Sequence, residues 1–289
     1  MPELPEVETV KIELTDKIIG LEISKVALTR TKMLINITPE YFTSRLEGKR
    51  IIDISRRGKY IIVHLLPKIR LVFHLGMTGI LIYPYMEKFA KNNSGDIKLK
   101  HNHFIFNFND STQMVFNDVR RFGKVYLVND VSEIKGIAHL GMEPLVDEFT
   151  PDSFFNILKS NSKKRIKSLI MNQKLIAGLG NIYANEALYR ANIHPMRMAS
   201  SLTHNDAVTL HEQIKHVLNK AIQLKGSTIS DGAFRNTEGK NGKFKQEILV
   251  YARKGKKCLK CQHLIEMVKI EGRSSFYCPV CQKNNVFHQ

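Results

Sequence analysis

The stretch CLKCQHLIEMVKIEGRSSFYCPVC, residues 258–281, holds all four cysteines of the 289-residue chain. Cys258 and Cys261 form one pair, Cys278 and Cys281 form another, and 16 residues separate the pairs. This spacing predicts a tetrahedral zinc site, because paired thiolates on tight turns are typical ligands of structural zinc. Four thiolates leave no coordination position for a substrate, so we expect one structural Zn²⁺.

The residues between the two cysteine pairs are expected to form a hairpin. Met267–Ile270 and Ser275–Tyr277 suit two strands, with Gly272 and Arg273 at the turn. Arg273 would then lie at a rigid tip, where its guanidinium can bind a phosphate in bidentate fashion. His263 is surplus to the zinc ligands, and we interpret it as a surface histidine.

The region before the cysteines has a helical pattern. Thr150 and Pro151 give an N-cap followed by proline at the first helical position. A glycine-punctuated turn, LIAGLGNIYANE at residues 175–186, joins two helices, and Asn181 would cap the second. With Lys163, Lys164 and Lys167 nearby, the turn is a candidate anion site, although an ordinary helical hairpin explains it equally well. We expect helices over 151–160, 163–173, 181–191 and 203–224.

The first 130 residues predict one short helix followed by β-strands. Pro5 suits the first turn of that helix, and its buried side would carry Val7, Val10, Ile12 and Leu14. The runs that favour strands are 21–28, 50–66, 70–83, 101–108 and 113–128, which indicate a β-sandwich. Residues 86–100 read as a polar loop and 226–247 as a long basic loop. The fold class is therefore α+β, with a β-sandwich domain over 1–133, a linker over 134–150, a helical domain over 151–247 and a zinc ribbon over 248–289.

The charge balance favours a polyanionic partner. The chain has 44 Lys and Arg against 27 Asp and Glu, a net charge of +17. Such an excess attracts phosphates and releases their counterions, which makes nucleic acid the leading partner. No apolar run approaches the ~20 residues of a membrane span. The acidic, proline-rich start is not a signal peptide, so we expect a cytoplasmic protein.

The N-terminus holds a possible nucleophile. Removal of Met1 would leave Pro2 with a free amine, whose pKa of about 7.7–8.0 lies well below that of lysine. A secondary amine can attack a sugar C1′ and form an iminium, with Glu3 and Glu6 nearby as candidate general acids or bases. Taken alone, these residues fit a helix start with acidic residues in its first turn better than a covalent catalyst, because helix starts are far commoner.

Several motifs together resemble those of bacterial formamidopyrimidine-DNA glycosylases, and the resemblance covers nearly the whole chain. The most specific are the N-terminus, MPELPEVETV, and the cysteine pattern. The others are SRRGKY at 55–60, HLGMTG at 74–79, KHNH at 100–103, DVRRFG at 118–123, GLGNIYANE at 178–186, GST at 226–228 and GRSSFYCPVCQ at 272–282.

The resemblance implies a role for each matching residue. Pro2 would be the nucleophile that forms the Schiff base, and Glu3 would assist departure of the base. Lys59 would serve β-elimination and Arg273 δ-elimination. Met77, Arg120 and Phe122 resemble the family's inserted triad, although Met77 and Phe122 in isolation also fit core packing. The DNA contacts would fall on His101, Arg120, Lys163, Lys167, Asn181 and Arg273.

We therefore expect a monomeric, bifunctional glycosylase and lyase of base excision repair. Its substrates would be oxidised purines, 8-oxoguanine and formamidopyrimidines, in double-stranded DNA. Two alternatives stay open: the endonuclease VIII-like branch, which prefers oxidised pyrimidines, and a non-enzymatic zinc-ribbon DNA-binding protein. Leu4 between the two Pro-Glu units favours the purine branch. The sequence departs from the family at Lys225 and Ala252, where glycine is usual, and at Val119, where proline is usual.

Overall fold

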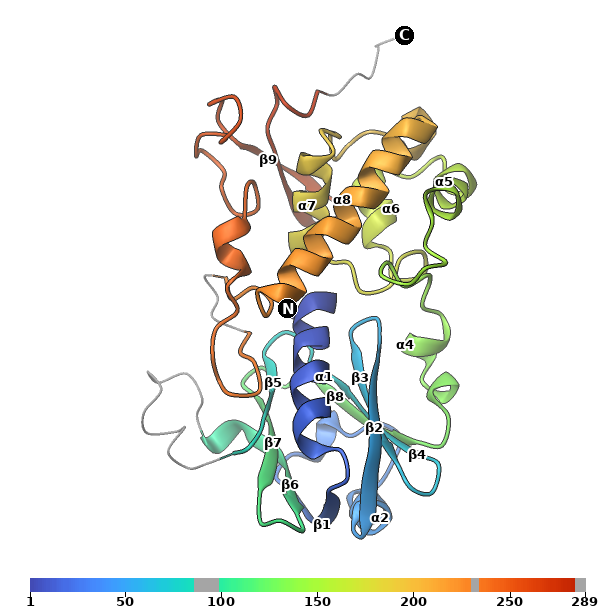
Figure 1. The fold of residues 1–289 in the computed structure, drawn as a ribbon, viewed down its shortest axis with the longest axis vertical. Coiled ribbons are helices and arrows are strands. Elements are labelled where there is room, and N and C mark those ends of the chain that lie inside the picture. Colours follow the sequence, from blue (N-terminus) through green and yellow to red (C-terminus); the bar gives the residue numbers. More distant parts are fainter. Residues whose placement is uncertain (86–98, 230–233, 284–289) are drawn as a thin grey trace. The chain divides into compact units, whose positions relative to one another are not determined.

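The computed structural model in Figure 1 describes residues 1–85, 99–229 and 234–283. The chain separates into two compact units, one of Met1–His139 with Ala221–Lys245, and one of Leu140–Lys220 with the chain from Gln246 onward. The segment from 221 to 245 therefore packs with the N-terminal unit, whereas our sequence boundaries placed it with the helices. The expected linker at 134–150 begins with a short helix, α4 (Lys135–Ala138).

The first unit is the expected β-sandwich. Its strands pair in the order β5-β7-β6-β1-β2-β3-β4-β8, and every neighbouring pair is antiparallel. Only two residue pairs join β1 to β2, so the strands form two four-stranded halves. The strands are β1 (Glu22–Leu28), β2 (Lys49–Arg57), β3 (Tyr60–Leu65), β4 (Ile69–His74), β5 (Gly79–Ile82), β6 (Asn102–Phe108), β7 (Gln113–Asp118) and β8 (Lys124–Val128).

Aromatic side chains fill the core of this unit. Phe73 on β4 meets Phe106 on β6 and Phe116 on β7 edge to face, with ring centroids 5.8 and 5.7 Å apart. The alternation of phenylalanines along β6 correctly predicted one buried face of that strand, since all three phenylalanines at 104, 106 and 108 are buried.

Helix α1 (Leu4–Ile18) packs against β2 and β3 of the same unit. Val7, Val10 and Leu14 are fully buried, as expected, but Ile12 is 40% exposed, so its assignment to the buried face was wrong. Position 12 lies two residues, or about 200°, from position 10 around the helix and so faces the other side.

Helix α2 (Pro39–Leu46) was not predicted. The hydroxyl of its N-cap, Thr38, accepts a hydrogen bond from Tyr41 N at 3.3 Å, and Phe42 and Leu46 are fully buried. Three short 3₁₀ turns complete this part of the chain: η1 (Thr31–Met33), η2 (Leu99–His101) and η3 (Val131–Glu133).

The described residues of the second unit combine four helices with the cysteine-bearing hairpin. Thr150 caps its first helix by accepting from Ser153 N at 3.1 Å, as the sequence predicted. The helix expected over 163–173 is shorter in the structure. The helices are α5 (Pro151–Ser160), α6 (Ile166–Met171), α7 (Asn181–Arg190) and α8 (His204–Gln223). The last residues of α8, from Ala221 onward, belong to the first unit. The remaining elements are η4 (Ala199–Ser201), η5 (Phe244–Glu247), β9 (Glu266–Ile270) and β10 (Arg273–Tyr277).

The long basic loop after α8 is well tied within the first unit. Gly242 N donates to Thr228 Oγ1 at 2.9 Å and Phe244 N donates to Gly226 O at 3.0 Å, which brings the two ends of the loop together. Residues 230–233 of this loop, and the predicted polar loop up to residue 98, lie outside the described residues. No helix among the described residues is long and apolar enough to cross a membrane.

Candidate active site and nucleic-acid interface

The start of α1 gathers the proposed catalytic residues of the N-terminus. Pro2 is buried and directly precedes Glu3, the N-cap, which is 3% exposed. The Glu6 carboxylate accepts from Glu3 N at 2.8 Å through Oε2 and from Ser227 N at 2.7 Å through Oε1. Glu6 therefore fixes the backbone of Glu3 and holds the loop after α8 beside it. Both carboxylate oxygens of Glu6 thus accept backbone hydrogen bonds, while Glu3 is the carboxyl group adjacent to Pro2.

Lys59 lies in the turn between β2 and β3 and is 8% exposed. The turn is tied to α1 through Arg56, whose Nε donates to Glu8 at 2.7 Å and whose Nη1 donates to Gly58 O at 2.9 Å. The ion pair between Arg56 and Glu8 thus links the lysine-bearing turn to the helix that begins after Pro2.

His74 is a residue of this region that the sequence reasoning missed. Burial, helped by the positive charges of Lys59 and Lys124, lowers its pKa to about 4. Its ring lies 4.8 Å from that of Tyr60, and its Nδ1 accepts from Gly76 N at 3.2 Å. A neutral His74 therefore supports the turn after β4. Its place in the HLGMTG motif was visible, but nothing in the motif revealed its neighbour Lys59.

The turns after β4 and β7 meet through Asp118, which is fully buried. Its carboxylate accepts from the hydroxyl of Thr78, from Arg120 N at 3.2 Å and from Gly123 N at 2.8 Å. The turns also approach at Gly76, where an added Cβ would lie only 2.5 Å from the carbonyl carbon of Phe122. Asp118 therefore sets the relative positions of the two turns.

The predicted wedge residues are carried by these turns. Phe122 is 52% exposed, and the Arg120 guanidinium stacks over its ring at 4.7 Å from the centroid. Met77 is half-buried in the facing turn. An exposed phenylalanine under an arginine is not core packing, and it suits insertion between bases. His101 ends η2, is half-buried, and has its ring 6.3 Å from that of the buried His103.

The second unit brings part of the predicted phosphate-binding set together. Arg273, exposed at the first position of β10, and Lys167 line one surface cavity of about 340 Å³, and Lys164 lines it as well. Lys167 is 1% exposed, and its Nζ donates to Ser274 O and Ser275 Oγ at 2.7 Å each. Lys167 therefore fastens α6 to the hairpin. Lys163 is exposed but is not among the residues of this cavity.

Asn181 does not cap α7 as we expected. The N-cap is Gly180, and Asn181 is the first helical residue, because the extended backbone needed at the cap falls on the glycine. The Asn181 carbonyl accepts from Asn185 Nδ2 at 2.6 Å, and Asn185 Oδ1 accepts from Phe276 N at 2.7 Å. Asn185, buried and not predicted, thus connects the glycine turn to β10.

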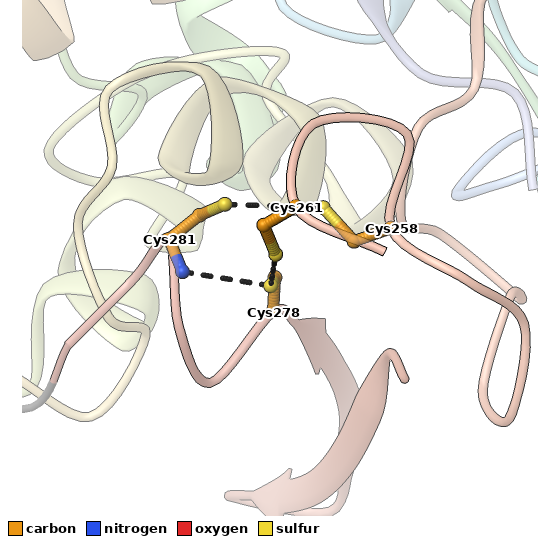
Figure 2. Close-up of side chains that lie close together, drawn as sticks. All are labelled: Cys258, Cys261, Cys278 and Cys281. Carbon is orange, nitrogen blue, oxygen red and sulfur yellow. Dashed lines mark hydrogen bonds between the residues drawn. The ribbon is translucent and has the colours of Figure 1, made fainter. Parts of the chain in front are cut away.

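The four cysteine sulfurs converge as the spacing predicted (Figure 2), and all lie within 4.8 Å of one another. Cys258 Sγ and Cys281 Sγ are 3.8 Å apart, and Cys261 Sγ and Cys278 Sγ are 3.3 Å apart. A zinc tetrahedron with bonds of about 2.3 Å has edges of about 3.8 Å, so the cluster fits the ion.

The hairpin between the cysteine pairs is tighter than expected. Its turn is Glu271-Gly272, both with positive φ, and Arg273 pairs with Ile270 in the ladder instead of lying in the turn. His263 is exposed, as predicted.

Family models match this chain along most of its length. The formamidopyrimidine-DNA glycosylase N-terminal domain matches residues 1–125, and the H2TH domain of the same enzymes matches residues 140–232. The zinc finger found in these glycosylases and in isoleucyl-tRNA synthetase matches residues 255–284. The chain belongs to the formamidopyrimidine-DNA glycosylase family. It is a DNA glycosylase of base excision repair, its partner is DNA, and its four cysteines bind a structural zinc ion.

Curated relatives and solved structures match this chain over nearly its whole length. A formamidopyrimidine-DNA glycosylase of Wolbachia pipientis (subsp. Culex pipiens) is 42% identical over 98% of this chain and 100% of its own length. One of Pelotomaculum thermopropionicum is 40% identical, covering 98% and 99%. The crystal structure of MutM (Fpg) from Thermus thermophilus has a TM-score of 0.84 at 36% identity, covering 97% and 98%. A Lactococcus lactis Fpg complex has a TM-score of 0.85 at 36% identity, covering 98% and 100%.

The departures from the formamidopyrimidine-DNA glycosylase pattern have a visible backbone setting. Lys225 and Ala252, which stand where glycine is usual, both adopt positive φ, +57° and +56°. A glycine reaches this conformation without strain, which explains the usual residue at both positions. Val119 is 48% exposed in the turn after β7, and nothing in the structure explains its replacement of proline.

Proposed function

We propose that this glycosylase excises oxidised purines from double-stranded DNA and then cleaves the strand, with Pro2 as its nucleophile. The observation that carries the proposal is the arrangement at the start of α1. Pro2 precedes the buried Glu3 at the positive end of the helix, and Arg56 ties the Lys59 turn to the same helix. The helix dipole disfavours a protonated amine at this end, which helps keep the nucleophile neutral.

The chemistry follows from these groups. After removal of Met1, the Pro2 nitrogen attacks C1′ while the bond from C1′ to the base breaks and the base departs with a proton, assisted by Glu3. Opening of the sugar ring then gives an iminium at C1′. Loss of a proton from C2′ expels the 3′ phosphate, a step assigned to Lys59. A second elimination, assigned to Arg273, expels the 5′ phosphate and leaves a single-nucleotide gap.

Each unit supplies its own DNA contacts in this proposal. Met77, Arg120 and Phe122 enter the base stack when the damaged nucleotide is turned out. His101 of the first unit, and Lys163, Asn181 and Arg273 of the second, bind the phosphate backbone. Lys167 acts by holding the hairpin that carries Arg273. We infer that the protein works as a monomer in the cytoplasm, where the chromosome of a bacterium lies.

Structures of similar proteins support the substrate class. Fpg from Lactococcus lactis has been solved with DNA containing Fapy-dG derivatives and with DNA containing an abasic site. MutM has been solved with DNA containing carbocyclic 8-oxo-G.

Borohydride trapping tests the proposal directly. The protein, with its natural N-terminus, is reduced on duplexes containing 8-oxoguanine, and the adduct is located by mass spectrometry after proteolysis. We expect the DNA on Pro2, no adduct when a residual tag extends the N-terminus, and binding without excision for Glu3→Gln. An adduct on Lys59, or no adduct, would overturn the assignment of Pro2.

The same assay separates the two alternative functions. A duplex containing an oxidised pyrimidine that is cut faster than 8-oxoguanine would indicate endonuclease VIII-like specificity. DNA binding without any covalent adduct on either lesion would indicate a non-enzymatic zinc-ribbon protein.

A further inference from the structure

Glu13 is a buried carboxylate that the proposed chemistry does not use. It lies on α1, seven residues or about two turns beyond Glu6, and is 8% exposed. Its Oε1 accepts from Lys225 Nζ at 3.1 Å and from Asn236 Nδ2 at 2.8 Å. Its Oε2 accepts from Thr237 N at 3.0 Å and from Thr237 Oγ1 at 2.8 Å.

The set of donors around Glu13 suits an ionised carboxylate. Burial alone would raise the pKa of Glu13, but the hydrogen bonds from Thr237, Asn236 and Lys225 outweigh it and lower the pKa below its ordinary value. A buried charge is tolerated when its hydrogen bonds are complete, and removing one partner from such a set is costly. Glu13 therefore holds the loop after α8 in one place.

The same loop is held at a second point by Glu6, which accepts from Ser227 N. Within the loop, Thr228 Oγ1 donates to Phe234 O at 2.7 Å, and Phe234 is buried in the core of the β-sandwich unit. Glu6 also accepts from Glu3 N, so segment 225–228 is connected through one side chain to the proposed acid.

Segment 225–228 also presents an unused polar group. The hydroxyl of Ser227 is buried and has no hydrogen-bond partner among the described residues. Buried hydroxyls are normally paired, so one without a partner beside Glu6 points to a ligand that completes it.

We propose that Glu13, together with Lys225, is a positioning residue for base excision that holds segment 225–228 beside the N-terminal site. This inference rests on the proposed function. In this inference the unpaired Ser227 hydroxyl of the segment binds the damaged base, and an abasic site has no base for it to bind. Displacement of the segment should therefore slow excision of the base and leave cleavage at an existing abasic site largely intact.

The test compares two single-turnover rates of the full-length, zinc-bound protein. One substrate is a duplex with 8-oxoguanine, and the other is the same duplex with a preformed abasic site. Glu13→Gln keeps the shape but turns one acceptor into a donor that faces donors, so we expect excision to slow by about tenfold or more. We expect cleavage of the abasic duplex to change by about twofold at most. Asp16→Asn, at an exposed carboxylate on the same helix, is the matched control and should change neither rate.

Lys225→Met provides a second variant that does not threaten the fold, because the Lys225 side chain is 60% exposed. Lys225→Met should slow excision by about threefold. The double variant should be no slower than Glu13→Gln alone, because both single changes remove the same contact between Lys225 and Glu13. Equal losses on the two substrates, or unchanged excision in Glu13→Gln, would overturn the inference. A parent protein that neither excises 8-oxoguanine nor is trapped on it would instead overturn the proposed function.

Discussion

Replacing Asp118 by alanine would test how the two wedge-bearing turns are held together. The change removes the acceptor of three hydrogen bonds, and the hydrogen bond from Gly123 N is buried. A buried N–H without an acceptor costs about 1–3 kcal/mol, whereas water can replace the acceptor at the more exposed Thr78 and Arg120. We therefore expect a loss of about 2–3 kcal/mol, concentrated in these turns.

The loss should appear mainly in the step that extrudes the base. If the whole of it falls on the transition state, excision of 8-oxoguanine from duplex DNA slows by about 30- to 150-fold. Cleavage at a preformed abasic site requires no base to be extruded, so it should slow by about fivefold at most. Single-turnover rates on the two substrates measure the difference, and thermal unfolding measures the effect on the fold.

Asp110→Ala is a matched control for this prediction. The Asp110 carboxylate also organises a turn, accepting from Thr112 N at 2.9 Å and from Thr112 Oγ1 at 2.7 Å, but it lies in the β6–β7 turn. We expect both rates to stay within about twofold of the parent. The reasoning about Asp118 fails if its alanine variant loses both activities equally, or loses neither.

Three further predictions concern the ribbon and the interior. Lys167→Met should weaken DNA binding without changing the slope of log affinity against log salt, whereas Arg273→Ala should reduce that slope by about 1. A reduced slope for Lys167→Met would show that the Lys167 ammonium contacts phosphate. Cys278→Ser, or removal of zinc by a chelator, should abolish DNA binding while circular dichroism retains the β signal of the first unit, and unimpaired binding without zinc would contradict a role for the ribbon. Because the pKa of His74 is about 4 in the folded protein and about 6.5 when unfolded, its contribution to stability is present above pH 6.5 and is lost as the pH falls toward 4. Over this range the unfolding free energy of the parent should fall by on the order of 2–3 kcal/mol more than that of His74→Asn. Parallel curves of unfolding free energy against pH would count against a buried neutral histidine.

The parts of the fold that the sequence predicted depend on local signals. The two cysteine pairs, the alternating phenylalanines of β6 and the Thr150-Pro151 helix start each involve neighbours along the chain. The same start signal was overlooked at Thr38-Pro39, where it begins α2. That helix is only eight residues long and lies between β1 and β2, so the strand-favouring sequence on either side outweighed the helix signal.

The supporting residues of the site could not be predicted in this way, because their partners are distant in the sequence. Glu13 and Asn236 are separated by 223 positions, and Asn185 and Phe276 by 91. A glutamate on a helix or an asparagine after a turn reads as an ordinary surface residue until the fold brings its partners to it. The reactive groups could be assigned from their motifs. Positioning residues could not, even where they lie inside a motif, as Asp118 and Asn185 do, because a motif does not show which distant group a side chain contacts.

The replacement at Lys225 shows why a positioning role explains the observations better than a stabilising one. A left-handed conformation costs a non-glycine residue about 1–2 kcal/mol, and a partly exposed ion pair returns about 0–1 kcal/mol. The contact with Glu13 therefore does not offset the strain at a side chain that is 60% exposed. Ala252 has the same strain and, being exposed, no compensating charge, so stability alone accounts for neither residue. What Lys225 adds is a fixed direction: it joins the start of the loop to the helix that also carries Glu6 and the N-terminal site, and that link is what the excision assay would measure.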